Sequence, residues 1–328
     1  MLITVIVCTR NRARQLRNLL ESFLALDPPA QAEWEMIIVD NGSTDDTARV
    51  IDEFGSHLPL RRVWEPRAGL SNARNAGVAA SKGDYICWTD DDVEVHQQWL
   101  SAYAQAFHRH PDGTIFGGVV EPVYEESPPH WMVENADKLV DVLAKRDHGL
   151  QERRLTTDLH LLPYGANFAV RAEEQRRFLY DPHLGVSPEQ KRLGEETVLL
   201  VSVASLGGAH YWVPDSRVRH LIPTSRMTFD YIGTYFQSVG ETWAYLSTSD
   251  GVPIMGQPIP MYGRRFGGVP LWIWRQSVVA EIVYRIKRTL RPSPSRWLDD
   301  LINKSRLAGA RNFLWRHHRS LTQIKTSN

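Results

Sequence analysis

The sequence predicts an α/β fold with a mostly parallel central sheet flanked by helices, followed by a helical C-terminal extension. Between residues 2 and 120, apolar runs alternate five times with segments of helical periodicity, which is typical of parallel strands joined by helical crossovers. The apolar runs are continuous rather than alternating, as in strands that are covered on both faces. Helical periodicity returns near the end of the chain, over residues 269–290 and 296–316.

The first half of the chain supplies strands and helices in strict alternation. Pro28 and Pro111 follow the first and the fourth helix, and neither helix can continue through a proline. Ser43 and Asp46 occupy the N-cap and N3 positions expected before the second helix. We expect strands over residues 2–8, 36–39, 60–64, 85–89 and 114–120, and helices over 16–24, 44–54, 70–80 and 99–107.

After Glu121 the alternation ends, and irregular segments rich in proline separate the remaining elements. We expect a helix near 134–144, a strand over 164–170, a loop over 181–193, a helix over 195–206, two short strands over 209–213 and 217–221, and a helix over 227–246.

The composition is typical of a globular protein. A chain of 328 residues with 42% hydrophobic residues can form one large globular domain or two smaller ones. Its two cysteines, Cys8 and Cys87, lie in apolar strand-like runs, so we expect buried thiols in a reducing compartment rather than a disulfide framework. The N-terminus lacks the basic flank of a signal peptide, and the sequence has no run of about eighteen apolar residues. We therefore expect a cytoplasmic protein that does not span a membrane.

The net charge is zero, but the charge is divided unevenly along the chain. From Tyr262 to Asn328, 14 Lys and Arg stand against 3 acidic residues, which gives this segment a charge of +11. The preceding residues therefore carry −11. A basic segment of this kind attracts anionic partners, either nucleic acid or the negatively charged cytoplasmic leaflet of a membrane.

The most informative stretch is DYICWTDDD at residues 84–92, where a buried strand leads directly into Asp90, Asp91 and Asp92. Three neighbouring carboxylates repel one another, so they are either well solvated or neutralised by a positive group. A divalent cation such as Mg²⁺ that carries a diphosphate fits this need, because it takes oxygen ligands from carboxylates, phosphates and water. The alternative is a solvated turn before the next helix, where acidic residues are also favoured.

Polar residues also follow the first two predicted strands, with Thr9 and Asn11 after the first and Asp40 after the second. In a parallel sheet the carboxyl ends of the strands share one edge, where ligands of α/β proteins bind, so we expect these residues to meet the acidic cluster. The turn after the first strand, TRNRARQ, has no glycine, which excludes the dinucleotide-binding fingerprint and the P-loop. A nucleotide bound here must be held by side chains and metal.

Seven segments in order resemble family 2 of the glycosyltransferases, which are nucleotide-sugar enzymes with the GT-A fold. Together they cover roughly residues 2–245. The segments are VIVCTRNR at 5–12, VDNGSTDDT at 39–47, GLSNARNAG at 69–77, DYICWTDDD at 84–92, YGANFAV at 164–170, GEET at 194–197 and VRHLIPTSR at 218–226.

The resemblance implies roles for the residues that match the family's motifs at the nucleotide. Thr9 and Asn11 would line the nucleobase pocket, and Asp40 would accept a hydrogen bond from the imide N–H of uracil or thymine. Arg74 would pair with the base or the diphosphate through its fork of donors. Arg226 would close over the diphosphate.

At the acidic cluster the resemblance implies a D-x-D pair with Asp91 between its members. Asp90 would lie near the ribose, and Asp92 would be a direct ligand of Mg²⁺ or Mn²⁺. His220 would be a further metal ligand, a role it holds in part of the GT-A group, and Asn167 would lie near the transferred sugar.

The catalytic base is expected in the GEET segment. Inversion at an anomeric carbon needs a carboxylate that removes the proton of the acceptor hydroxyl as this hydroxyl attacks. Glu196 matches the family's base, although the family usually has aspartate there, and Glu195 is the alternative base if the start of the helix is rotated.

Each of these residues also has a structural alternative. Thr9 and Asp40 could cap helices, Arg74 and Arg226 could be surface cations, and His220 could be a hydrogen-bonded structural histidine. The two glutamates could instead interact with a helix N-terminus.

The expected function is therefore that of a metal-dependent, inverting glycosyltransferase of the hexosyltransferase type. It would move a sugar from a UDP- or dTDP-linked donor to a saccharide or lipid-linked saccharide in the synthesis of a surface polysaccharide or glycan. We expect a catalytic domain over residues 1–250, with a nucleotide-binding half (1–120) and an acceptor-binding half (121–250), and a basic helical extension over 251–328. The alternatives are a sugar nucleotidyltransferase and a non-catalytic protein that binds saccharide or nucleic acid.

The C-terminal extension combines aromatic and basic residues. Trp272, Trp274 and Tyr284 alternate with Arg275 and Arg285, a composition that suits a helix lying on anionic lipid. We expect peripheral contact with the inner face of the cell membrane and no nucleic acid partner. A helical cap on the catalytic domain, or a surface for self-association, is the alternative.

Overall fold

The computed structural model describes residues 1–156, 158, 161–248 and 258–326. Contacts divide the chain into two compact units. The first, here called the sheet unit, comprises residues 1–125, 143–191 and 195–222, and the second, the helical unit, comprises 126–142, 192–194 and 223–328. The predicted domain boundary at residues 250 and 251 lies outside the described residues.

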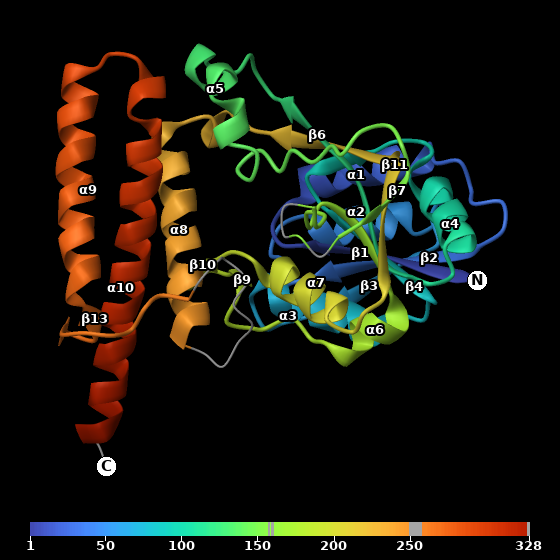
Figure 1. Cartoon of the computed structure of the whole chain (residues 1–328). Coiled ribbons are helices and arrows are strands. Elements are labelled where there is room, and N and C mark those ends of the chain that lie inside the picture. Colours follow the sequence, from blue (N-terminus) through green and yellow to red (C-terminus); the bar gives the residue numbers. More distant parts are fainter. Residues whose placement is uncertain (157, 159–160, 249–257, 327–328) are drawn as a thin grey trace. The chain divides into compact units, whose positions relative to one another are not determined.

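The sheet unit is built on one nine-stranded sheet (Figure 1). Its strands are β1 (Leu2–Thr9), β2 (Glu33–Asp40), β3 (Leu60–Trp64), β4 (Tyr85–Asp90), β5 (Val93–Val95), β6 (Gly113–Tyr124), β7 (Arg153–Leu155), β8 (Asn167–Arg171) and β11 (Ala209–Ile222). The order is β3-β2-β1-β4-β8-β6-β11-β5, with β7 paired to β11. Strands β1, β2, β3, β4, β6 and β11 point the same way, so the mostly parallel sheet predicted from the sequence is confirmed.

Helices cover both faces of this sheet, because the strands are apolar on both sides. On one face, Ile3, Val5 and Val7 of β1 pack with α1 (Ala13–Leu24), α2 (Thr47–Phe54) and α4 (Trp99–Arg109). On the other face, Ile6 packs in a cluster with residues of α3 (Leu70–Ala80), α6 (Ala172–Arg177) and α7 (Glu195–Ala204). The alternation of β1 residues between the two clusters follows the two-residue period of a strand.

Several predicted elements differ from the observed ones. The two short strands expected over 209–213 and 217–221 are one strand, β11, with a register shift between Val213 and Arg217. Pro214 lies in this shift, where a residue without a backbone N–H is tolerated. The loop expected over 181–193 contains a small two-stranded sheet, β9 (Gly185–Val186) and β10 (Lys191–Arg192).

The helix expected near 134–144 does not form. Helix α5 (His130–Glu134) ends where the prediction begins, and only a 3₁₀ turn, Ala136–Lys138, follows it. Asn135 caps α5 by donating from its side-chain amide to the carbonyl of Trp131 (2.7 Å), which competes with continuation of the helix.

The helical unit contains three long helices, α8 (Phe229–Thr248), α9 (Leu271–Leu290) and α10 (Leu298–Thr326), and a hairpin of β12 (Arg265–Phe266) and β13 (Val269–Pro270). Helices α8 and α10 cross closely at two glycines. A Cβ atom on Gly240 would lie 1.9 Å from the carbonyl oxygen of Arg306, and one on Gly309 would lie 1.9 Å from that of Gln237. Helix α8 therefore packs on α10 within the helical unit. Among the described helices, none is long and apolar enough to cross a bilayer.

Candidate active site

The predicted site residues of the sheet unit gather at the carboxyl ends of its strands. Thr9 ends β1, Asp40 ends β2 and Asp90 ends β4. Glu195 and Glu196 begin α7, and His220 lies near the end of β11 (Figure 1). The parallel sheet brings these ends to one edge, as the sequence predicted.

Within the acidic cluster, Asp91 is bound entirely by protein groups. Its Oδ1 lies 2.6 Å from Nη1 of Arg12, and its Oδ2 accepts a hydrogen bond from the hydroxyl of Thr9 at 2.8 Å. The same Arg12 nitrogen lies 3.2 Å from Asp92 Oδ2. Burial raises the pKa of Asp91 to about 6, and the positive charge of Arg12 opposes this rise. Arg12 therefore supplies part of the neutralising charge that three adjacent carboxylates require.

Arg74 connects the acidic cluster to the candidate base. This buried guanidinium lies 3.0 Å from Glu195 Oε1, 3.7 Å from Glu196 Oε2 and 3.8 Å from Asp90 Oδ1. Burial alone would lower the pKa of Arg74, but the charges of the surrounding acids, Glu195 foremost, outweigh it and raise the pKa. Gly165 permits this arrangement, because a Cβ atom there would lie 3.0 Å from Arg74 Nη2.

The two glutamates at the start of α7 lie in different surroundings. Glu195 is buried and pairs with Arg74, whereas the side chain of Glu196 is 21% exposed. Burial and the neighbouring charge of Glu196 raise the pKa of Glu195 to about 8, although Arg74 opposes this rise. Glu196 is thus the more exposed carboxylate of the two.

His220 lies beside Asp92 because β11 and β5 pair in antiparallel register, His220 opposite Val93. Its Nε2 is 3.5 Å from Asp92 Oδ1, and its Nδ1 is 3.4 Å from the carbonyl oxygen of Leu143. When Nδ1 donates to a carbonyl, Nε2 is the nitrogen that can ligate a metal.

The donor set at Asp92 and His220 suits a divalent cation that also binds phosphate. Two ligands at about 2.1 Å from one cation can lie 3.5 Å apart. Within the described residues, no group of three or more His, Cys, Asp or Glu side chains could hold a metal by itself. This is compatible with Mg²⁺, which takes one or two carboxylates and fills its other positions with water and substrate phosphates.

The loop expected to hold the nucleobase is held together by its own side chains. Asn11 adopts a left-handed conformation (φ 52°), and its Oδ1 accepts a hydrogen bond from the backbone N–H of Thr44 at 2.7 Å. Asp40 is fully buried, with Oδ2 2.6 Å from Nη2 of Arg62 and Oδ1 accepting from the backbone N–H of Ser43 at 2.9 Å. Contact of Asp40 with a base therefore remains a prediction, and it requires a further lone pair of this carboxylate.

Asn167 corrects one of the predictions. It has no exposed surface, and its side-chain oxygen accepts from Trp99 Nε1 and from the hydroxyl of Tyr103, both at 2.8 Å. Its amide nitrogen donates to the carbonyls of Val119 and Ser216, both at 2.9 Å. With every hydrogen-bonding position occupied, Asn167 ties β8 to α4, β6 and β11 rather than presenting an atom to a sugar.

The sequence did not predict the roles of two cations, Arg12 and Arg62. A third arginine, Arg226, was predicted to belong to the site, but the structure does not test this. Arg12 and Arg62 neutralise Asp91 and Asp40, and each is distant in sequence from its partner. A basic residue in the turn after the first strand was the available signal for Arg12. Arg226 lies in a 3₁₀ turn of the helical unit, so its predicted role at the diphosphate stays a prediction.

Comparisons with known proteins point to one family. A family model described as glycosyl transferase family 2 matches residues 4–173. A glucosyl-dolichyl phosphate glucuronosyltransferase of Haloferax volcanii is 26% identical over 243 residues, which cover 71% of this chain and 73% of that protein.

Two solved structures share the fold over nearly the whole chain. The mannosyltransferase PcManGT from Pyrobaculum calidifontis, in complex with GDP-Man and Mn²⁺, has a TM-score of 0.60 at 18% identity and covers 96% of this chain and 87% of its own. Residues 1–349 of TarS from S. aureus, in complex with UDP-GlcNAc, have a TM-score of 0.57 at 16% identity, with coverage of 98% and 92%. These likenesses show a GT-A-like fold. Because the family model spans more than half of the sequence, the chain belongs to glycosyl transferase family 2.

Proposed function

We propose that the protein transfers a sugar from a nucleoside diphosphate sugar to a saccharide or lipid-linked saccharide, with inversion at the anomeric carbon. The observation that carries this proposal is the link through Arg74 between the acidic cluster and Glu196. Asp90, which would lie at the ribose of the donor, and Glu196, which would meet the acceptor, thus both contact a single buried cation. Membership of the family supports the reaction class.

The donor is a UDP- or dTDP-linked sugar in this proposal. TarS is a neighbour with bound UDP-GlcNAc, which supports a uracil nucleotide, whereas PcManGT binds GDP-Man. Thr9, Asn11 and Asp40 would hold the base, with Asp90 at the ribose. The acceptor class follows the glucosyl-dolichyl phosphate named for the relative from Haloferax volcanii. A lipid-linked acceptor would place the reaction in the cytoplasm, at the inner face of the cell membrane.

Asp92 and His220 would hold Mg²⁺ or Mn²⁺, and PcManGT with bound Mn²⁺ supports this choice. When bound, the cation offsets the negative charge that grows on the leaving diphosphate. Arg12 helps to hold Asp91 and Asp92 in place, and it contacts Asp92 through Oδ2, whereas His220 lies near Oδ1.

Glu196 would take the proton of the acceptor hydroxyl as the hydroxyl attacks the anomeric carbon. Its partial exposure lets an acceptor reach the carboxylate, and Arg74 fixes the carboxylate's position at 3.7 Å. Glu195, which is buried against the same arginine, would position Arg74 rather than contact the acceptor.

A panel of nucleotide sugars tests the proposal through release of nucleoside diphosphate, measured with Mg²⁺, with Mn²⁺ and with EDTA. We expect release from one donor, loss of that release in EDTA, and a fall of about a hundredfold or more in Asp92→Ala.

The matched control is Asp46→Ala, which removes an exposed carboxylate of the same unit. It should leave the rate unchanged. If the wild type releases no diphosphate from any donor, or if Asp92→Ala is as active as Asp46→Ala, the proposal is wrong.

A further inference from the structure

Helix α9 has two apolar faces, and only one of them is covered. Within the helical unit, Ile273, Ser277, Ala280 and Tyr284 form its buried face. A second set of apolar side chains lies on the other side of the helix, each between 46% and 71% exposed: Leu271, Val278, Val279, Ile282, Ile286 and Leu290. Spacings of three, four and seven residues keep them on one stripe, with Val278 and Val279 side by side, about half a turn from the buried residues.

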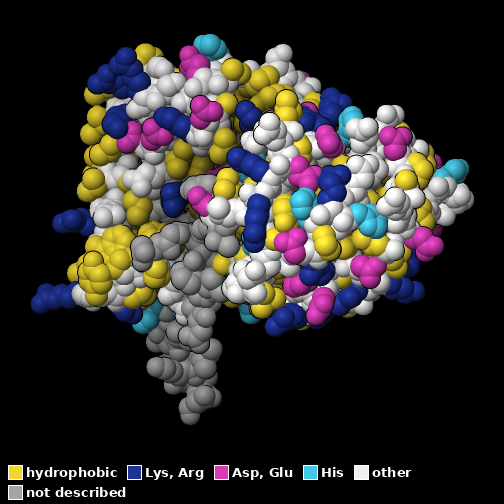
Figure 2. All heavy atoms as spheres, turned by 45° about the vertical axis from the view of Figure 1, so that its right-hand side comes forward, with side chains coloured by type: hydrophobic (Ala, Val, Ile, Leu, Met, Phe, Trp, Pro, Cys, Tyr) yellow, Lys and Arg dark blue, Asp and Glu magenta, His cyan; other side chains and the backbone are white. Residues whose placement is uncertain are grey.

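Such a stripe is unusual for a helix at the surface of a monomer. A surface helix normally pairs one apolar stripe with a polar opposite face, and helices that are apolar on both sides are normally covered on both. Contiguous exposed apolar patches mark interaction sites on proteins or membranes. Figure 2 shows hydrophobic side chains gathered at its left-hand edge with Lys and Arg nearby, in the region where Figure 1 places α9.

The charge around this stripe is strongly positive. Residues 262–291 contain seven Lys and Arg and a single acid, Glu281, for a net charge of +6. Arg264 and Arg265 are exposed in the segment before α9, and Arg288 and Arg291 are exposed at its end. Arg275 lies within the stripe itself, where its aliphatic stem can cover apolar surface while its charged end reaches outward.

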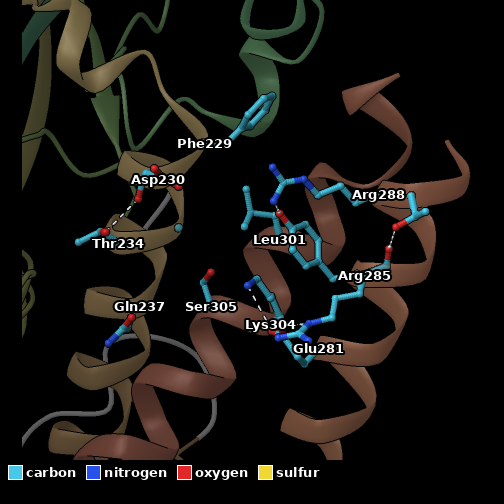
Figure 3. Close-up of a pocket in the computed structure, with 13 residues that line it drawn as sticks. Phe229, Asp230, Thr234, Gln237, Glu281, Arg285, Arg288, Leu301, Lys304 and Ser305 are labelled. Atoms are coloured by element: carbon cyan, nitrogen blue, oxygen red, sulfur yellow. Dashed lines mark hydrogen bonds and ion pairs between the residues drawn. The ribbon is translucent and has the colours of Figure 1, made fainter. Parts of the chain in front are cut away.

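A groove of about 680 Å³ runs along the flank of the stripe, between α8, α9 and α10. Figure 3 shows Arg285 and Arg288 extending toward it from α9, and Lys304 from α10. Glu281 binds both Arg285 (2.6 Å) and Lys304 (3.2 Å), and Arg288 donates to the hydroxyl of Tyr284 (2.9 Å). Three cations against two acids, Glu281 and Asp230, leave this groove with net positive charge.

Either a second copy of the chain or a lipid surface could cover the apolar stripe. The charge around the stripe favours the lipid surface. A second copy of the chain would bring one basic segment against another, and like charges across an interface are unfavourable. An anionic lipid surface offers both the apolar boundary and the negative charge that the stripe and its flanks require.

We propose that α9 docks on an anionic lipid bilayer. The helix lies in the plane of the interface, with the stripe residues at the level of the acyl chains. Arg285 and Arg288, on the flank that borders the groove, meet the headgroup phosphates. This contact is independent of sugar transfer, so Asp92→Ala should bind lipid as the wild type does.

Flotation of the full chain with vesicles tests the docking surface. The wild type should float with phosphatidylcholine vesicles that contain phosphatidylglycerol, and not with phosphatidylcholine alone. Ile282→Ser combined with Ile286→Ser should weaken binding by roughly tenfold or more, because two half-exposed apolar side chains no longer enter the lipid. Arg285→Gln combined with Arg288→Gln should weaken it by roughly tenfold through lost attraction to the anionic surface.

Matched controls test whether binding depends on this surface or on exposed apolar and basic residues in general. Leu150→Ser with Leu179→Ser removes two exposed leucines of the sheet unit, and Arg49→Gln with Arg177→Gln removes two of its exposed arginines. Both controls should bind vesicles as the wild type does, and all variants should melt at the wild-type temperature. Three results would overturn the proposal: no flotation of the wild type, equal flotation of the α9 variants and their controls, or a dimer in solution that the isoleucine variant dissociates.

Discussion

The three adjacent aspartates have different partners in the structure. Asp91 gives both oxygens to Arg12 and Thr9, so it belongs to the framework of the site. Asp90 is 37% exposed at the end of β4, and Asp92 lies beside His220. Asp90 and Asp92 are the pair that we propose to meet the donor, with Asp91 as the structural residue between them.

The sequence could predict the acidic residues but not the cations that hold them. Strand ends are visible as polar residues after apolar runs, so Asp40 and Asp90 could be placed correctly. Arg12 and Arg62 reach their carboxylates only through the folded sheet. No spacing rule along the chain reports such a pairing, because it depends on which strands become neighbours.

The buried Glu195 should make stability depend on pH. Its pKa is raised from 4.5 to about 8, so the folded protein holds a proton that the unfolded chain releases. The stabilisation is complete below about pH 4.5 and is lost as the pH rises through about 8. In Glu195→Gln this loss is absent, so the melting temperature of the variant should rise relative to the wild type between pH 5 and pH 8.

Thermal melts of both proteins across this pH range measure the difference. Glu173→Gln, on the exposed face of α6, is the control and should follow the wild type at every pH. A constant offset between Glu195→Gln and the wild type would contradict the assignment of a raised pKa to Glu195.

The position of His220 depends on the pairing of two strands that are distant in sequence, β5 and β11, and secondary-structure propensity does not predict such a pairing. Strand β11 continues through the register shift at Pro214, and only its pairing with β5 brings His220 beside Asp92. The sequence predicted the helix over 70–80 with the observed bounds of α3, because its signals are local. It missed β5, whose three residues carry too little pattern to be recognised alone.

The close crossing of α8 and α10 makes a prediction about packing. Gly240→Ala would place a Cβ atom against the backbone of Arg306, so the helices must separate and the free energy of unfolding should fall by about 1–3 kcal/mol. The matched control lies on the same helix. A Cβ atom on Gly233 would have Ser305 Oγ as its nearest neighbour, at 3.5 Å, so Gly233→Ala should be neutral or stabilise by up to about 1 kcal/mol.

Denaturant unfolding of the two variants measures both effects in one experiment. Equal stability of Gly240→Ala and Gly233→Ala would show that the two helices do not pack at the distance described.

In the whole molecule, the acidic and basic parts of the sequence fall largely in different structural units. The acidic body corresponds largely to the sheet unit with its carboxylate-rich edge, and the basic segment from Tyr262 onward falls in the helical unit. The sequence predicted the fold class and the family. It could not predict that α8 packs with α9 and α10, because amphipathic periodicity shows that a helix has a buried face but not which partner covers it.

In the proposed function, Glu196 performs chemistry at a site that binds the donor through other residues. The most direct measurement compares Glu196→Gln with the wild type for donor affinity by calorimetry and for the rate of transfer from bound donor. We expect an unchanged donor affinity and a transfer rate lower by about a hundredfold to ten-thousandfold. Transfer by Glu196→Gln at the wild-type rate would show that Glu196 is not the base.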